Sequence, residues 1–433
     1  MDDFTHNYCM NGRLVRNKLN ILNNTRLGRF TVVTGARQVG KSTLVQMTFP
    51  DTPILRFDSM AERAAYQELT PADWISRYRT VILDEVQKAP QIFDTLKSCF
   101  DQDSDLRYVL LGSSQVMFMQ GVRETLAGRV ALLKLYSFTL PELMDRGEVE
   151  PQSRFIELLA TPHQATSILD AMLDPVIALS DREAIAKHWF DYLLRWGGMP
   201  ALLDPQMNNQ NRMDWLRDYQ ELYLQRDLGD LARLSDLEPF ARTQKIAALR
   251  TGELVQFAAL GAQAGVAANT AKRYLQYLEL SYQIILLQPW FRNTEKRLSK
   301  MPKLHFLDNG VRRGILRRTG EVDGHEFEST LVAETIKQAN FVNPGAEFSH
   351  LRTSDGREVD LLMELENGYY AFEFKLSEHT VDGDARHLRD LSSILDKPLL
   401  AGFVLSRDPK ARRLSNGLVG EPIYAIPSWR FFG

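Results

Sequence analysis

The stretch of sequence that decides the fold is Thr31-Val32-Val33-Thr34-Gly35-Ala36-Arg37-Gln38-Val39-Gly40-Lys41-Ser42-Thr43. An apolar β-branched run leads into a loop that fits the phosphate-binding pattern G-x-x-x-x-G-K-[ST] without a mismatch. Because glycine adopts positive φ freely, Gly35 and Gly40 let backbone N–H groups turn inward around phosphates. We expect Lys41 to contact the β- and γ-phosphates of ATP and Ser42 to bind Mg²⁺. The expected ATP-binding residues are Gly35, Ala36, Arg37, Gln38, Val39, Gly40, Lys41, Ser42 and Thr43.

Length and composition are those of an ordinary globular protein. The chain has 433 residues, of which 44% are hydrophobic and 25% are charged, and this length suggests about two to four domains. Two cysteines, Cys9 and Cys99, exclude a disulfide framework. We expect a cytoplasmic protein without membrane contact, because no apolar run is long enough to cross a bilayer and the N-terminus lacks a secretory pattern. The net charge of −3 argues against a protein that binds polyanions through a uniformly basic surface.

The apolar runs that follow the loop indicate an α/β domain over residues 1–141. They cover residues 53–57, 81–83, 109–111 and 130–135 and alternate with helix-compatible segments, which favours a mostly parallel sheet with ligands at the carboxyl ends of its strands. The second run ends in Asp84 and Glu85. Beside the P-loop, Asp84 is expected to hold Mg²⁺ and Glu85 to orient or deprotonate the attacking water. A solvated loop start is the alternative.

Two further motifs of this domain are polar. Gly112 is followed by Ser113 and Ser114, where a sensor of the γ-phosphate is expected, although a capped turn explains the serines nearly as well. Arg129 stands just before the fifth strand. An arginine that reaches the nucleotide of a neighbouring subunit would imply a ring-forming homo-oligomer, and a surface ion pair is the equally open alternative.

These motifs resemble those of a prokaryotic AAA-type ATPase family, whose members join the ATPase to a C-terminal region of unassigned function. Gln115 departs from the pattern, because a third small polar residue is expected there. The resemblance extends over nearly the whole chain. The segments that carry it are 35–42, 83–87, 112–114, 126–129, 223–227, 303–310 and 358–360.

The middle of the chain reads as a helical lid over the nucleotide, at residues 142–235, followed by a winged helix at residues 236–320. Gly265 breaks an apolar helix, and Asn269 can cap a second helix whose expected outer face carries Lys272 and Arg273. Two strands and a basic tip follow. Residues 268–318 hold eleven Lys/Arg against three Asp/Glu, a balance of +8. The expected DNA-binding residues are Lys272, Arg273, Arg292, Lys296 and Arg297. The alternative is a structural module whose basic face meets the acidic remainder of the protein.

The C-terminal region, residues 321–433, contains a predicted β-hairpin that carries acids and a lysine on one face. With Asn367-Gly368 as the turn, Asp360 lies opposite Lys375, and period-two alternation places Glu373 on the same face. This pattern resembles the active site of the PD-(D/E)xK restriction-endonuclease fold, which implies catalytic roles for Asp360, Glu373 and Lys375. Glu328 matches the acid of an upstream helix in that fold, so Mg²⁺ is expected on Glu328, Asp360 and Glu373. An amphipathic hairpin with a cross-strand ion pair is the alternative.

The sequence therefore predicts an ATP-hydrolysing AAA-type ATPase that acts on DNA by binding or remodelling, with or without metal-dependent cleavage by a nuclease-like domain. The alternative is a nucleotide-switched regulatory or signalling ATPase that binds a protein partner and carries an inactive nuclease-like domain.

Overall fold

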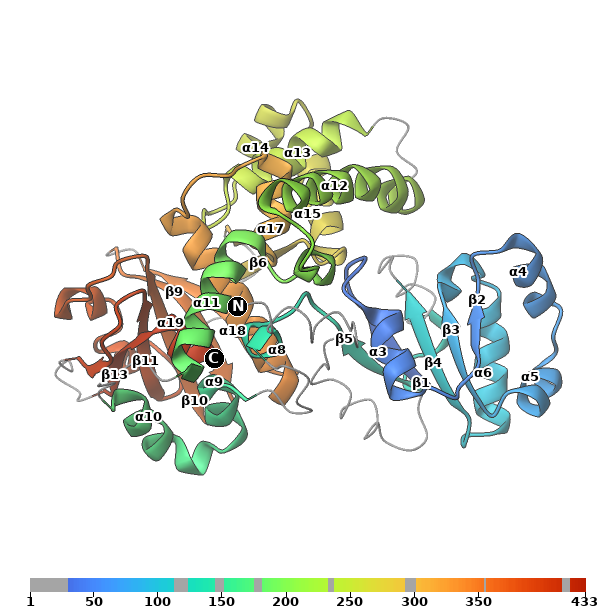
Figure 1. Cartoon of the computed structure of the whole chain (residues 1–433), viewed down its shortest axis with the longest axis horizontal. Coiled ribbons are helices and arrows are strands. Elements are labelled where there is room, and N and C mark those ends of the chain that lie inside the picture. Colours follow the sequence, from blue (N-terminus) through green and yellow to red (C-terminus); the bar gives the residue numbers. More distant parts are fainter. Residues whose placement is uncertain are drawn as a thin grey trace.

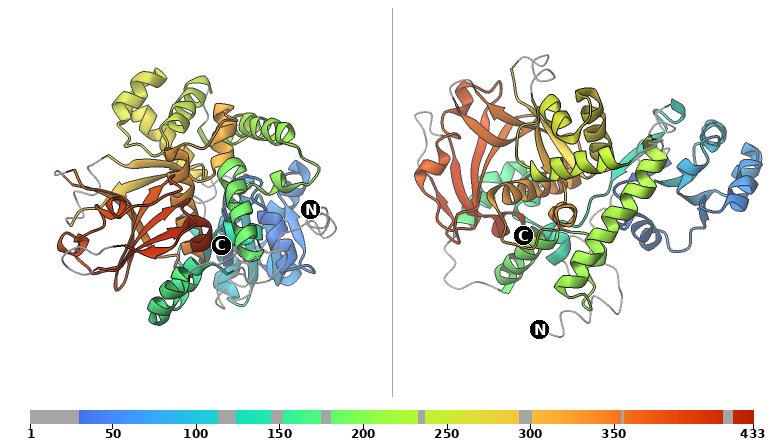
Figure 2. Two further views of the ribbon diagram at one scale, coloured as in Figure 1. Left: turned by 60° about the vertical axis from the view of Figure 1, so that its left-hand side comes forward. Right: turned by 90° about the horizontal axis from the view of Figure 1, so that it is seen from above.

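The computed structural model describes residues 30–112, 124–144, 152–174, 181–232, 237–292, 301–353, 356–414 and 421–433. The predicted site residues Ser113, Ser114, Lys296 and Arg297 lie outside these ranges. The five-stranded sheet and the large sheet of the C-terminal region occupy opposite ends of the molecule (Figure 1), and the view from above agrees (Figure 2). A group of helices, α13 (Glu238–Leu249), α14 (Phe257–Ala264) and α15 (Ala268–Leu280), stands between them at one side. No helix within the described residues combines the length and apolarity needed to span a bilayer.

The N-terminal domain is the parallel sheet that the sequence predicts. Its strand order is β2-β3-β4-β1-β5, and every neighbouring pair is parallel. The strands are β1 (Phe30–Thr34), β2 (Ile54–Arg56), β3 (Thr80–Asp84), β4 (Arg107–Gly112) and β5 (Val130–Lys134). The helices are α3 (Lys41–Thr48), α4 (Met60–Gln67), α5 (Pro71–Arg77) and α6 (Ile92–Gln102), with the short η1 (Val86–Lys88).

The helices expected to form a lid do not all lie over the P-loop. Phe155, Leu169 and Phe190 are buried in one core with Phe327 and Phe372 of the C-terminal region, and Figure 1 shows their helices beside that sheet. The prediction of a lid over residues 142–235 is therefore wrong for its first part, whose apolar faces belong to the C-terminal core. The elements are α8 (Leu140–Met144), α9 (Arg154–Ala160), η2 (Pro162–Gln164), α10 (Ala165–Leu173), α11 (Asp181–Trp196), η3 (Pro200–Leu203) and α12 (Asn209–Ala232).

The next unit has the helix-turn-helix order that the sequence predicts. Its elements are α13 (Glu238–Leu249), α14 (Phe257–Ala264), α15 (Ala268–Leu280), β6 (Ile284–Pro289) and β7 (Lys303–Phe306). Gly265 ends α14 in the left-handed region with φ 73°. The predicted cap is wrong, because α15 begins at Ala268 with Ala267 as its N-cap and Asn269 already lies within the helix. The two strands pair antiparallel, with Ile284 opposite Phe306.

The hairpin β6–β7 also belongs to the C-terminal sheet. β6 pairs parallel with β8, with Gln288 beside Ser349, so one sheet of eight strands has the order β12-β13-β11-β10-β9-β8-β6-β7 within the described residues. The strands are β8 (Glu347–Arg352), β9 (Glu358–Leu365), β10 (Gly368–Lys375), β11 (Leu399–Ser406), β12 (Arg412–Arg413) and β13 (Ile423–Pro427). The helices are α17 (Asn309–Leu316), α18 (Gly324–Val342), η4 (Asp382–Ala385), η5 (Leu391–Ser393) and α19 (Ser428–Phe432). The sheet therefore crosses the border expected near residue 320.

The predicted hairpin of β9 and β10 forms, but with a different register. Phe372 lies opposite Leu361 and Gly368 opposite Leu365, so the turn is Glu366-Asn367 and the predicted pairing of Asp360 with Lys375 is wrong. The shift is two residues. Because side chains alternate with a period of two, Asp360, Glu373 and Lys375 still share a face.

Candidate functional site

The P-loop joins β1 to α3 at the carboxyl edge of the N-terminal sheet. Gly40 has φ 91° and precedes the helix as its N-cap, a conformation that favours glycine. A side chain at Gly35 would have its Cβ 2.0 Å from the Leu135 carbonyl oxygen, so this position has no room for one. Lys41 Nζ donates to the carbonyl oxygens of Gly35 at 2.9 Å and Ala36 at 2.8 Å. The lysine thus lies within the loop that is expected to surround the phosphates.

The acids at the end of β3 lie next to the P-loop helix. Ser42 Oγ donates to Asp84 Oδ2 at 3.1 Å. Burial, and secondly the neighbouring Glu85, raise the pKa of Asp84. Hydroxyl and carboxylate oxygens suit Mg²⁺, so Ser42 and Asp84 fit the predicted metal position. Glu85 Oε2 accepts a hydrogen bond from Gln87 Nε2 at 2.5 Å, which orients its carboxylate.

Arg129 lies at the opposite edge of the same sheet. Val130, the next residue, pairs with Phe30 at the start of β1, whereas the P-loop follows the end of β1, a strand length of roughly 15 Å away. The guanidinium makes a two-bond ion pair with Asp101 of α6, at 2.8 and 3.1 Å. Arg129 therefore cannot act on the nucleotide of its own subunit. A contact of Arg129 with the nucleotide of a neighbouring subunit stays a prediction.

Three aromatic side chains connect the P-loop region to the other elements. Tyr219 of α12 directs its hydroxyl to the Arg37 carbonyl oxygen at 3.4 Å. Tyr282, in the turn between α15 and β6, places its hydroxyl 3.5 Å from Thr34 Oγ1, and its ring lies edge-on to Tyr136 at 5.7 Å. Tyr282 has φ 61°, a costly conformation for an aromatic residue. The packing therefore fixes this turn against the strand that leads into the P-loop.

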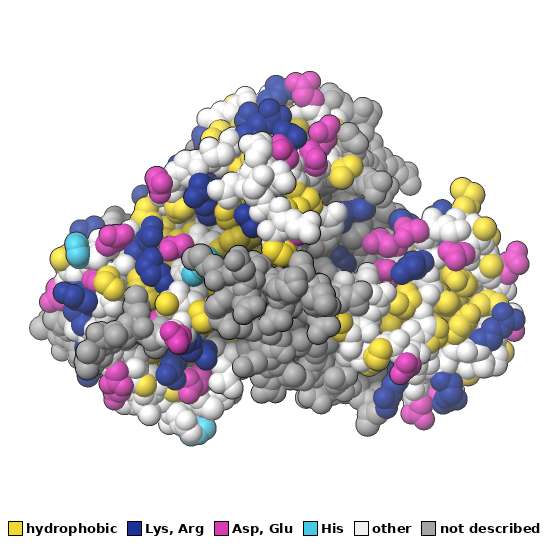
Figure 3. All heavy atoms as spheres, in the orientation of Figure 1, with side chains coloured by type: hydrophobic (Ala, Val, Ile, Leu, Met, Phe, Trp, Pro, Cys, Tyr) yellow, Lys and Arg dark blue, Asp and Glu magenta, His cyan; other side chains and the backbone are white. Residues whose placement is uncertain are grey.

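The basic residues of the segment 268–318 form less of a surface patch than their number suggests. Lys272 and Arg273 are exposed on α15 as predicted, and Arg292 is exposed and donates to the carbonyl oxygens of Ile394 and Leu395. Lys303, Arg312 and Arg313, however, are buried. On the face shown in Figure 3, basic side chains are interspersed with acidic ones.

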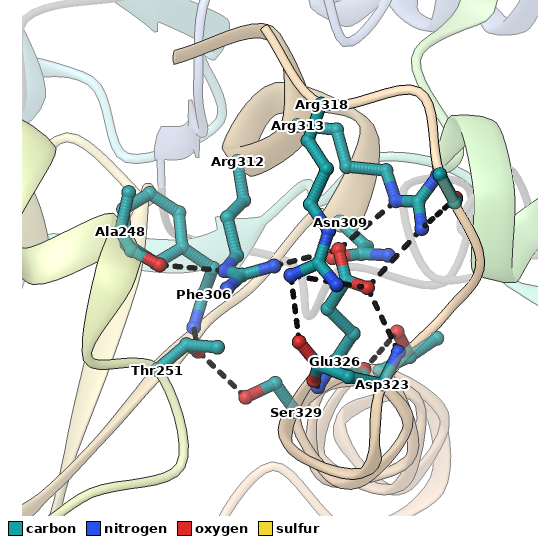
Figure 4. Close-up of polar contacts among 12 residues, drawn as sticks. Ala248, Thr251, Phe306, Asn309, Arg312, Arg313, Arg318, Asp323, Glu326 and Ser329 are labelled. Carbon is teal, nitrogen blue, oxygen red and sulfur yellow. Dashed lines mark hydrogen bonds and ion pairs between the residues drawn. The ribbon is translucent and has the colours of Figure 1, made fainter. Parts of the chain in front are cut away.

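Two of the buried arginines form a network that joins α13, α17 and α18. Glu326 accepts from Arg312 at 2.7 Å and from Arg313 at 3.0 and 3.1 Å, and Arg312 Nε also donates to the Ala248 carbonyl oxygen at 2.7 Å. Figure 4 shows Glu326 facing both guanidinium groups, with Thr251 and Ser329 bonded below them. These charges are used inside the molecule, so they add nothing to a nucleic-acid surface.

The C-terminal acids gather around a lysine that the sequence analysis did not select. Lys303 Nζ, from β7, lies 2.5 Å from Glu328 Oε1, 3.3 Å from Asp360 Oδ1 and 3.7 Å from Glu358 Oε1. Asp360 Oδ2 accepts from the Phe374 backbone N–H at 3.0 Å. The structure therefore brings Glu328 next to Asp360, as predicted from the resemblance, but with an ammonium group between them.

Lys375 lies at the edge of this cluster. Its Nζ is 2.8 Å from Glu373 Oε2, and its side chain is 35% exposed. Burial raises the pKa of Glu328 and of Glu373, and Asp360 raises both further. Burial disfavours the Lys303 ammonium, but Glu328 and Asp360 outweigh this and raise the pKa of Lys303. Among the described residues, no group of three or more His, Cys, Asp or Glu side chains has the arrangement of a metal site.

Sequence reasoning missed Lys303 and His305. Both are polar residues that alternate with Leu304 and Phe306, so they share one face of a strand. Nε2 of the fully buried His305 lies 3.7 Å from Glu328 Oε1. Two ionisable residues at alternate positions in a buried strand are the signal that could have identified them.

Three segments of the chain match models of known protein families. Residues 28–144 match a family described as AAA domain, and residues 187–321 and 323–427 match two domains of unknown function, DUF8612 and DUF4143. An uncharacterised protein of Mycobacterium tuberculosis is 27% identical over 354 residues, 79% of this chain and 69% of that protein. An uncharacterised protein of Haemophilus influenzae is 20% identical over 390 residues, which cover 83% of this chain and 86% of that protein. The solved Walker-type ATPase of Pyrococcus abyssi has a TM-score of 0.44 and 13% identity, over 70% of this chain and 94% of that one.

The AAA match covers the P-loop, the acids that end β3 and Arg129 in one segment. Together with the contact of Ser42 with Asp84, this match supports an AAA-type ATPase in the N-terminal domain.

Proposed function

We propose that this protein hydrolyses ATP with Mg²⁺ and uses the nucleotide state to control DNA binding by the module of α13–α15 and β6–β7. Lys41 would bind the β- and γ-phosphates, Ser42 and Asp84 would hold Mg²⁺, and Glu85 would activate the attacking water. The metal would neutralise charge on the transferring phosphoryl group.

The observation that carries the coupling is the contact of Tyr282 with Thr34 at 3.5 Å. Thr34 is the last residue of β1, directly before the P-loop, and Tyr282 lies two residues after the end of α15. A change in the loop on nucleotide binding therefore has a short mechanical route to the helix that carries Lys272 and Arg273. The exposure of these two side chains supports the DNA-binding part.

The test measures the affinity for a DNA duplex with ATP and with ADP, in the Glu85→Gln variant that holds ATP. We expect the two nucleotides to give different dissociation constants and a log–log salt slope of about −4, because about four or five phosphates are contacted. Tyr282→Phe should reduce the difference between nucleotides, whereas the matched Tyr277→Phe on α15 should preserve it. Equal affinities with both nucleotides would exclude the coupling.

Charge reversal tests the DNA surface itself. The Lys272→Glu and Arg273→Glu double variant should weaken binding and flatten the salt slope by about 2. A double variant of equal charge change, Lys97→Glu with Lys410→Glu, alters exposed lysines on α6 and before β12, both outside this module, and should leave the slope nearly unchanged. Equal loss in both variants would indicate a net-charge effect and no defined surface.

A second candidate is a nucleotide-switched ATPase that binds a protein partner and carries an inactive nuclease-like domain. The position of Lys303 among the carboxylates favours it over metal-dependent cleavage by Asp360, Glu373 and Lys375. DNA binding that is absent at every salt concentration, together with normal ATP turnover, would select this candidate.

A further inference from the structure

The centre of the C-terminal acidic cluster is occupied by a side chain from a different unit. Lys303 is the first residue of β7, the second strand of the hairpin that follows α15. Its side chain is only 5% exposed. Its ammonium group contacts Glu328 of α18 and Asp360 of β9 at 2.5 and 3.3 Å. An ammonium group is a compact cation that can donate three hydrogen bonds. It therefore satisfies charge and hydrogen bonding where carboxylates of α18 and β9 converge.

Two unsatisfied atoms show that the cluster has unused ligand capacity. Within the described residues, Glu373 Oε1 and His305 Nε2 are buried without a hydrogen-bond partner. His305 Nε2 lies 3.7 Å from the Glu328 oxygen that contacts Lys303. Carboxylate oxygens and neutral imidazole nitrogens are ligands of divalent metals such as Mn²⁺.

We propose that Lys303 acts as an internal cation that closes a latent divalent-metal site formed by Glu328, Asp360 and Glu373. While the hairpin β6–β7 is in its present position, the ammonium group repels a second cation and fills the space between Glu328 and Asp360. The wild-type C-terminal region then binds neither Mg²⁺ nor Mn²⁺. This inference concerns the acidic cluster alone and does not depend on the proposed coupling to DNA.

The experiment compares Mn²⁺ binding by the full-length, nucleotide-free wild type and variants, measured by electron paramagnetic resonance. Lys303→Met keeps the length of the side chain and removes its charge, so it should gain one Mn²⁺ site with at least tenfold higher affinity than any wild-type site in this cluster. The added change Asp360→Asn should abolish the gain. Lys303→Arg keeps the positive charge and should remain like the wild type.

Thermal unfolding provides a readout that survives poor folding of Lys303→Met. The uncompensated carboxylates should lower its Tm, and Mn²⁺ should restore part of the loss, whereas Mn²⁺ should leave wild-type Tm equal to that of wild type with EDTA. Wild-type Mn²⁺ binding that Asp360→Asn removes would overturn the proposal. So would a folded Lys303→Met protein that binds no additional Mn²⁺.

Discussion

Lys41 and Glu85 are expected to serve different steps of ATP hydrolysis, so their substitution separates binding from chemistry. Lys41 contacts phosphates in ground and transition states, whereas Glu85 acts chiefly on the attacking water. We expect Lys41→Ala to abolish Mg²⁺-dependent hydrolysis and Glu85→Gln to slow turnover about 100-fold or more with nucleotide still bound. Phosphate release and equilibrium binding of a fluorescent ATP analogue measure the two effects. Unchanged turnover in Glu85→Gln would remove Glu85 from the mechanism.

Glu334 predicts a pH dependence of stability. It is buried, accepts from the Leu140 backbone N–H at 2.6 Å and from Gln338 Nε2 at 2.7 Å, and burial raises its pKa to about 7 from the ordinary 4.5. The folded state therefore binds this proton more tightly than the unfolded state. The contribution to stability is full below pH 4.5, falls as the pH rises to about 7, and stays lost above it.

Glu334→Gln removes this titration. Relative to the wild type, the variant should gain on the order of 1–3 kcal/mol in the free energy of unfolding between pH 5 and pH 8. Urea unfolding at both pH values measures the gain, and Glu366→Gln in the exposed turn after β9 is the control. A constant difference between wild type and variant across this range would show that Glu334 does not titrate there.

Local patterns revealed many site residues, but not their partners from distant segments. The P-loop glycines and Lys41 follow from one motif, Asp84 follows from the acids that end an apolar run, and the shared face of Asp360 and Glu373 follows from strand alternation. Lys303 precedes its partner Asp360 by 57 residues, in a different predicted unit. No local sequence pattern relates positions so far apart, so the ion pair of Lys303 with Asp360 could be identified only from the folded structure.

At the scale of elements, the network around Glu326 holds α17 and α18 together. Removing its charge leaves Arg312 and Arg313 buried without a counterion, and breaking a buried pair in this way costs about 3–5 kcal/mol. We expect Glu326→Gln to lower the free energy of unfolding by about that amount, measured by urea titration with tryptophan fluorescence. Glu157→Gln, which removes an exposed pair with Arg154, should change it by less than about 0.5 kcal/mol. Equal effects would show that the network is not a stabilising element.

The elements themselves were largely predictable, and their packing was not. Apolar runs placed β1 to β5, and the outer face expected to carry Lys272 and Arg273 is exposed on α15. The register of β9 and β10 was missed because Asn367-Gly368 is a strong turn signal, yet Gly368 pairs within the ladder. The lid was misplaced because an amphipathic helix specifies an apolar face without naming the surface that covers it.

At the scale of the whole molecule, the four predicted units do not keep separate cores, and two of them share one sheet. β6 pairs with β8, and Asp308 links two units by capping α17 while accepting from the Gly198 backbone N–H at 2.9 Å. A Cβ at Gly310 would lie 1.8 Å from the Trp196 carbonyl oxygen, which explains a glycine at this crossing. The segment from Lys303 to Gly310 therefore contributes to the acidic cluster and to the junction with α11. A movement of the hairpin β6–β7 would therefore change both the acidic cluster and the junction with α11.

Arg129 lies at the edge of the sheet opposite the P-loop of its own chain, so a role in ATP turnover requires a neighbouring subunit. If it completes the site of a neighbouring subunit, Arg129→Ala should lose ATP turnover, and mixing it with inactive Lys41→Ala should restore part of the activity through hybrid sites. Asp101→Asn distinguishes this role from the ion pair seen here. If Arg129 acts on the nucleotide of a neighbouring subunit, ATP turnover tolerates the loss of Asp101. If Arg129 only forms a structural ion pair, Arg129→Ala and Asp101→Asn lower turnover equally. Turnover by mixed samples across a concentration series is the measurement, and equal defects without rescue would assign Arg129 to the ion pair alone.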